Sequence, residues 1–194
     1  MKKTLSILIE DEPGILIRII TLINSKKYIN KIESLVVCSS EKKGLSRIIT
    51  VVNLEKKDDN TSIQLTKQLK KLINVLKVID ISVLPSIERE LLLIKIEINN
   101  SNQLELFNIV KIFRCNIIDL AEKSIIIEIT ADPGKIAAFQ KILTKYKILE
   151  LVRTGKIGLI RQSGINSEQL KTAIHFKDDY FSHFKKKYKH QLFS

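Results

Sequence analysis

An acidic turn stands near the start of the chain, where residues 11–14 read Asp-Glu-Pro-Gly between an apolar run and an amphipathic run. Asp11 or Glu12 is a candidate helix cap, and Pro13 suits a first helical turn. Gly14 has no side chain where the first amide N–H groups of a helix still lack partners. These amides and the helix dipole attract a carboxylate, while Asp11 could bind an ammonium group. The corner therefore suits a free amino acid held by both charged ends, although a plain helix cap explains the same residues.

The sequence shows no other set of residues suited to catalysis or metal binding. The histidines His175, His183 and His190 all lie near the C-terminus, without acids or cysteines at matching spacing. We therefore expect no histidine base in the core and no metal site. Residues 132–135 read Asp-Pro-Gly-Lys but lack the earlier glycine of a phosphate-binding loop, so they predict a capped helix. The chain is not expected to be an enzyme by itself.

Two further polar groups fit ordinary surface structure. Glu88 and Glu90 alternate along an apolar run with Arg89 between them, which predicts a solvent-exposed strand face. Residues 153–155, Arg-Thr-Gly, predict a turn between strands rather than a site. The corner at residues 11–14 is therefore the candidate site.

Apolar periodicity places this corner between a strand and a helix. Residues 1–84 predict strand, helix, strand, strand, helix, strand, which is a ferredoxin-like unit with two helices on one face of an antiparallel sheet. Gly44 marks the expected hairpin, and the second helix is expected to be capped within residues 60–62. The leucines along one side of that helix are Leu65, Leu69, Leu72 and Leu76. The expected ranges are strands at 4–10, 31–40, 45–55 and 75–84, with the first helix at 13–26.

The same order of elements repeats in residues 85–161, after a joint at Pro85 and Ser86. Asp132 is expected to cap the last helix, with Pro133 in its first turn. The expected ranges are strands at 88–98, 115–122, 124–131 and 148–155, helices at 102–114 and 132–146, and a further strand at 156–161. The fold class is therefore α+β, with two tandem ferredoxin-like (βαββαβ) units and a C-terminal extension at 162–194 that is partly helical or disordered.

Composition argues against a membrane protein. The 194-residue chain is 44% hydrophobic, but no apolar run approaches the roughly 20 residues of a membrane span. Its start has neither the long apolar region of a secretory signal nor the composition of a transit peptide. The net charge of +12 comes mostly from scattered lysines, which favours a solvated surface over a nucleic-acid-binding face.

Two cysteines, Cys38 and Cys115, lie in apolar surroundings far apart in the sequence. Without Cys-x-x-Cys spacing, they predict buried and reduced thiols.

Several segments together resemble one family. The run TLSILIEDEPGILIRI at 4–19, with IESLVV at 32–37 and SRIITVV at 46–52, resembles the ACT domain of the small, regulatory subunit of acetolactate synthase (acetohydroxyacid synthase). ERELLLIKI at 88–96 and ELVRTGKIGLIR at 150–161 are similar to the second domain of that subunit. The resemblance covers residues 2–161 in order, and it divides the chain at 1–84, 85–161 and 162–194.

This resemblance implies a non-catalytic partner of a large subunit, which carries thiamine diphosphate, magnesium and FAD. The small subunit would activate the large one and confer feedback inhibition by valine, or another branched-chain amino acid, in the synthesis of valine, isoleucine and leucine. Members of the family pair their ACT domains side by side as a homodimer, with the effector at the interface. The residues of this chain that map to the effector site are Asp11, Glu12, Pro13, Gly14, Ile15, Leu16, Asn30 and Ile32.

Two departures from the family pattern concern the same site. The family often has asparagine where this chain has Asp11. Residues 28–34, YINKIES, carry two extra residues around Asn30, and Lys27 stands where glycine is usual. Both changes fall on residues that would hold the effector.

The end of the chain and its composition indicate a cellular location. Residues 163–171 resemble the extension of cyanobacterial and algal-plastid members, and lysine, isoleucine and asparagine are heavily used. We therefore expect a plastid (chloroplast) stroma, or otherwise a bacterial cytoplasm. The alternative function is an amino-acid-responsive nucleic-acid-binding regulator, but the sequence shows no helix-turn-helix or basic ribbon outside the two units. We expect neither nucleic acid nor a membrane as a partner.

Overall fold

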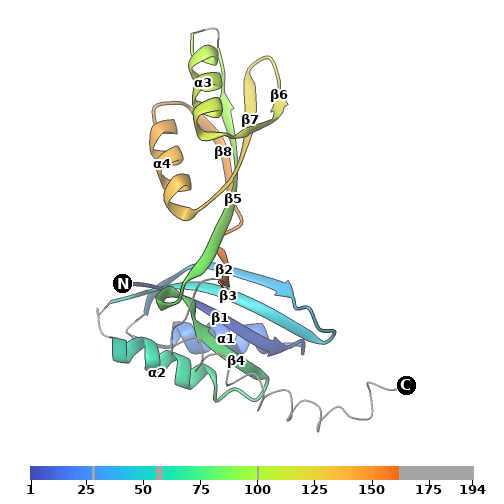
Figure 1. The fold of residues 1–194 in the computed structure, drawn as a ribbon, viewed down its shortest axis with the longest axis vertical. Coiled ribbons are helices and arrows are strands. Elements are labelled where there is room, and N and C mark those ends of the chain that lie inside the picture. Colours follow the sequence, from blue (N-terminus) through green and yellow to red (C-terminus); the bar gives the residue numbers. More distant parts are fainter. Residues whose placement is uncertain (28, 56–58, 100, 162–194) are drawn as a thin grey trace.

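A computed structural model describes residues 1–27, 29–55, 59–99 and 101–161 of the chain. Its first unit is one four-stranded sheet in the order β2-β3-β1-β4, and every paired strand is antiparallel to its neighbour. Two helices cover one face of this sheet (Figure 1). The elements are β1 (Lys2–Glu10), α1 (Ile15–Asn24), β2 (Ile29–Ser39), β3 (Leu45–Leu54), α2 (Asp59–Leu69), β4 (Val75–Asp80) and the 3₁₀ turn η1 (Ile81–Val83).

Alternation along β1 and helical spacing along α1 build the core of this unit. Leu5, Ile7 and Ile9 point to one face of the sheet because successive strand residues point to opposite faces. They are buried together with Ile15, Ile19 and Ile23, which recur at helical spacing along one side of α1. Gly44 has a positive φ of 76° in the turn between β2 and β3, as the hairpin prediction requires.

The second unit repeats the topology, with its sheet in the order β6-β7-β5-β8 and two helices on one face (Figure 1). The predicted fold class of two tandem ferredoxin-like units is therefore confirmed. Asp132 caps α4 as predicted, since its Oδ1 accepts a 3.0 Å hydrogen bond from the Lys135 amide, and this bond lowers the pKa of the Asp132 carboxyl. The elements are β5 (Ser86–Glu97), α3 (Gln103–Phe113), β6 (Asn116–Leu120), β7 (Ser124–Ala131), α4 (Pro133–Leu143), β8 (Ile148–Arg153) and β9 (Ile157–Ile160).

One long strand joins the two units. The first residues of β5, Ser86–Arg89, pair with β9, which confirms the further strand expected near 156–161. The rest of β5, Glu90–Glu97, pairs with β7 on one side and with β8 on the other. The strand runs from the first unit up into the second (Figure 1), so the joint is a two-stranded ribbon rather than a loose linker.

Three predicted boundaries in the first unit are wrong. Helix α2 begins at Asp59, ahead of the expected caps, and Thr61 and Ser62 lie within its first turns. Leu72 lies in the turn after α2 and Leu76 lies on β4, so only the first two of the four leucines belong to the helix. Strand β4 ends at Asp80, where the side chain accepts a 3.0 Å hydrogen bond from the Ser82 amide and starts η1. A local cap therefore replaced the expected continuation of the strand.

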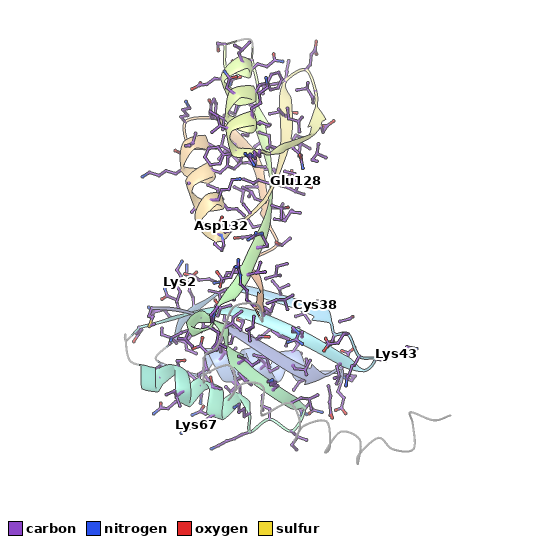
Figure 2. The ribbon with its side chains drawn as sticks, in the orientation of Figure 1. Lys2, Cys38, Lys43, Lys67, Glu128 and Asp132 are labelled. Carbon is purple, nitrogen blue, oxygen red and sulfur yellow. The ribbon has the colours of Figure 1, made fainter. Side chains whose placement is uncertain are left out.

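The cysteine prediction is partly wrong. Cys38 is exposed on the edge strand β2 (Figure 2), while Cys115 is half-buried after α3. Both thiols are free. An apolar run does not bury every member when its strand lies at the edge of a sheet.

We expect Cys38 to be alkylated at least about ten times faster than Cys115 at pH 8. Burial raises the pKa of the Cys115 thiol to about 11, so about one molecule in a thousand carries the reactive thiolate at that pH. Mass spectrometry of peptides after timed exposure to iodoacetamide measures both rates in one sample. Equal rates would show that the Cys115 thiol is not shielded.

Among the described residues, no helix has the length and apolar character needed to cross a membrane.

Candidate ligand-binding site

The helix that follows β1 has Gly14 as its N-cap residue, and neither of the two acids before it caps the helix. Helix α1 begins at Ile15, and its N-cap Gly14 has a φ of 83° and makes no side-chain capping bond. The predictions that Asp11 or Glu12 caps this helix, and that Pro13 lies in its first turn, are therefore wrong. Gly14 occupies the cap position because glycine enters the left-handed region with little strain.

The acids of this corner are held by an asparagine from the loop before β4. Asn74 donates from Nδ2 to Glu12 Oε2 at 2.7 Å and to Glu10 Oε2 at 3.3 Å. Its carbonyl accepts a 2.9 Å bond from the Glu10 amide. Asn74 is only 8% exposed and its bond to Glu10 is buried, whereas Glu12 is exposed, so the three bonds together fix the direction in which the chain leaves β1. No local pattern in the sequence pointed to Asn74, because it lies more than 60 residues from Glu10 and Glu12.

Open space faces the first turn of α1. A Cβ atom built at Gly14 has no heavy atom within 4 Å. The first regular bond of the helix runs from the Arg18 amide to the Gly14 carbonyl at 3.2 Å. The amides of Leu16 and Ile17 come before it in the chain, so the helix itself offers them no carbonyl to bind. Asp11 is exposed three residues before Gly14, and its own amide donates to the Gly44 carbonyl at 2.9 Å. A small carboxylate can approach these amides without displacing a side chain at Gly14.

The structure brings only part of the predicted site together within one chain. Glu10 pairs with Leu45 at one end of β3, and Ile29 pairs with Leu54 at the other end. These ends are nine residues apart along β3 (45 to 54), or about 30 Å at roughly 3.3 Å per residue. Exposed Asn30 and half-buried Ile32 start β2 and thus lie far from the corner of their own chain.

A buried ion pair lies where the two units meet, and the sequence did not predict it. Glu90 is only 5% exposed, and its two carboxylate oxygens accept bonds from Arg153 Nε at 2.6 Å and Nη2 at 2.7 Å. The bond to Glu90 raises the pKa of the Arg153 guanidinium. Beside it, Lys156 Nζ binds Glu88 Oε1 at 2.8 Å. The prediction of a solvent-exposed acidic face is wrong, because β5 turns these acids toward Arg153 at the end of β8 and Lys156 just after it.

These ion pairs line an open cavity of about 860 Å³ between the units. Its other walls come from β1 and β2 of the first unit and from the start of α4 in the second. Both acidic and basic side chains line the cavity, so its surface does not carry charge of one sign that would attract a charged ligand. In the described parts of the chain, no three His, Cys, Asp or Glu side chains cluster in a way that could hold a metal ion. The three histidines lie outside the described residues.

Two tandem ferredoxin-like units, the first with a glycine-capped strand-to-helix corner, place the chain in the class of ACT-domain regulatory subunits. Residues 5–77 match the model described as the ACT domain of acetolactate synthase small subunits, and residues 89–162 match the small subunit of acetolactate synthase. A "Probable acetolactate synthase small subunit" from Archaeoglobus fulgidus is 40% identical over 161 residues, covering 83% of this chain and 98% of that protein. The chain belongs to the family of acetolactate synthase small subunits, which are regulatory and not catalytic subunits.

Two more relatives extend the comparison. The crystal structure of the acetolactate synthase small subunit from Thermotoga maritima is similar with a TM-score of 0.75 and 36% identity, covering 84% of this chain and 99% of that one. "Acetolactate synthase small subunit 2, chloroplastic" from Arabidopsis thaliana is 39% identical over 168 residues. Those residues are 87% of this chain but only 34% of the Arabidopsis protein, so the chain spans about a third of that relative.

Proposed function

We propose that this chain activates the large subunit of acetolactate synthase and makes it sensitive to feedback inhibition by valine. In this proposal, thiamine diphosphate, magnesium and FAD belong to the large subunit. The open corner at Gly14 is the observation that favours an effector, since it leaves space where α1 begins and the exposed Asp11 stands three residues before it. The family relationship supports the large subunit as the partner.

The separation of the predicted site residues suggests that two copies of the chain complete the site. Strand β2 is the outer strand of its sheet, and it runs parallel to β1 because both are antiparallel to β3. If two copies pair antiparallel along β2, the Asn30 end of one copy lies beside the Ser39 end of the other. The hairpin that follows Ser39 contacts the corner, since Gly44 accepts the bond from Asp11. Asn30 and Ile32 would then face the Gly14 corner of the second copy.

Valine would inhibit the large subunit by changing the way in which two copies of this chain pair. A ligand shifts an equilibrium only by its difference in affinity for the two states. An effector bound between two copies contacts both, so its affinity depends on how their sheets are paired. A coupling of about 1 to 3 kcal/mol gives effects of several-fold to about a hundred-fold.

Reconstitution tests this function directly. We expect the chain, mixed with its large subunit, to raise acetolactate formation several-fold, and valine to reverse much of that gain. Calorimetry on the small subunit alone should show valine binding at one site per interface. A chain that raises activity but binds no valine, leucine or isoleucine would be an activator without a sensor.

The nucleic-acid alternative finds no support in the described residues. Lys2, Lys43 and Lys67 lie on different sides of the first unit (Figure 2), so the positive charge is spread rather than gathered in a stripe. The described helices each connect strands of a sheet, and none pairs with another as a helix-turn-helix. Salt-sensitive binding to DNA would reopen this alternative.

The proposed working parts are residues 1–84 for effector binding and 85–161 for transmission, with 162–194 outside the described residues. The chloroplast name of the Arabidopsis relative supports a plastid stroma, while the archaeal and bacterial relatives fit a cytoplasm.

A further inference from the structure

A glycine of the second unit lies directly against strand β2 of the first. Gly155 has a φ of 83°, and a Cβ atom built on it would lie 2.8 Å from Ser34 Cβ and 3.4 Å from Val36 Cγ2. Both the backbone conformation and the lack of space therefore require glycine. The backbone of Gly155 and the Ser34 Cβ atom are in tight contact.

The turn that carries Gly155 is fixed to β5. The Thr154 amide donates to the Leu91 carbonyl at 3.1 Å, and the Leu91 amide donates to Thr154 Oγ1 at 3.1 Å. The ion pairs of Arg153 with Glu90 and of Lys156 with Glu88 flank this turn on both sides. The turn therefore moves with the second unit.

The β2 side of the contact is irregular. The pairing of β2 with β3 shifts register between Ile29 and Lys31 and again between Ile32 and Ser34. Irregularities of this kind disrupt the hydrogen-bond ladder locally and bend the strand, so the start of β2 is tied to β3 by fewer regular bonds. Ser34 Oγ is buried and has no hydrogen-bond partner among the described residues, so only packing holds this side chain against the turn.

A second contact gives the ribbon a fixed point. A Cβ atom built at Gly158, on β9, would lie 3.0 Å from Ile81 Cδ1, on η1. The second unit thus touches the first at η1 and at β2. A shift of β2 relative to the rest of the first sheet would move one contact and not the other, which would tilt the second unit.

We propose that the contact between Ser34 and Gly155 transmits effector binding from β2 to the second unit. This inference rests on the proposed function, in which Asn30 and Ile32 meet the effector just ahead of Ser34 on the same strand. An effector that pulls on the start of β2 moves Ser34, and the turn at Gly155 follows because Ser34 Cβ packs directly against Gly155. Ser34 acts here as a positioning residue and does not touch the effector.

The test compares two substitutions at one position. Ser34→Gly removes the Cβ atom that meets Gly155, whereas Ser34→Ala keeps it and deletes only the unpaired hydroxyl. We expect the Ser34→Gly holoenzyme to retain at least about five times more activity at saturating valine than the parent. Calorimetry on its full-length small subunit should give the parent affinity for valine. Ser34→Ala should be inhibited like the parent.

Ser124→Gly is the matched control, since it makes the same change on strand β7 of the second unit, where Ser124 pairs with Glu97, away from both β2 and the turn at Gly155. It should bind and respond to valine as the parent does. Full inhibition of Ser34→Gly with normal valine binding would overturn the transmission role and leave the proposed function standing. Absence of valine binding in the parent chain would instead overturn the proposed function and this inference with it.

Discussion

Replacing Gly14 with aspartate should abolish inhibition by valine while the chain still folds and activates its large subunit. The added side chain enters open space, so it meets no steric clash. Its carboxylate would lie beside the first-turn amides of α1, where it would take the place of the effector's carboxylate and repel it. We expect the valine concentration for half-inhibition to rise at least about 100-fold, measured with reconstituted holoenzyme.

Strain at the left-handed position should cost about 1 to 2 kcal/mol of stability. Gly14→Ala and Gly44→Ala separate this strain from the charge, because both glycines have positive φ and open space around an added Cβ atom. Neither alanine variant adds a carboxylate, so Gly44→Ala should remain sensitive to valine and Gly14→Ala should lose less than Gly14→Asp. If Gly14→Asp were inhibited as strongly as the parent, the effector would not bind at this corner.

The sequence predicted those structural features that are formed by residues close to one another in the chain. Apolar periodicity predicted both units and the topology of both sheets. The Asp132 cap was also predicted, because Asp, Pro and the Lys135 amide lie within four residues of one another. The Asp-Glu-Pro-Gly corner gives a similar local signal, but its geometry depends on Asn74 from another part of the chain. That bond engages the Glu12 side chain, and Gly14 is the residue at the cap position.

Contacts between the units could not be predicted from either unit alone. Glu90 alternates with apolar residues as a surface acid would, yet β5 leaves its pairing with β9 near this residue and enters the second sheet. Its partner Arg153 is 63 residues away. Gly155 was predicted as a turn residue, and the structure adds the close approach of β2. Whether Asn30 and Ile32 meet the Gly14 corner depends on a second copy, so this part of the site stays a prediction.

Replacing Arg153 with methionine should lower the stability of the chain by about 3 kcal/mol at pH 7. The substitution keeps much of the side-chain volume but leaves the Glu90 carboxylate without its two bonds. Glu90 is 5% exposed, and an ionised group in that position cannot recover its hydration. The Arg153 side chain is 38% exposed, which places the expected loss at the lower end of the range for breaking a buried pair. Urea unfolding followed by far-ultraviolet circular dichroism measures it.

Lys156→Met provides the matched control, because it removes a cation from the same cavity. Its partner Glu88 has a side chain that is 27% exposed, so water replaces the lost bond and the cost should stay below about 1 kcal/mol. Adding Glu90→Gln to Arg153→Met removes the unpaired charge and should recover most of the loss. Equal losses in Arg153→Met and Lys156→Met would show that Glu90 reaches water and that the joint does not depend on this pair.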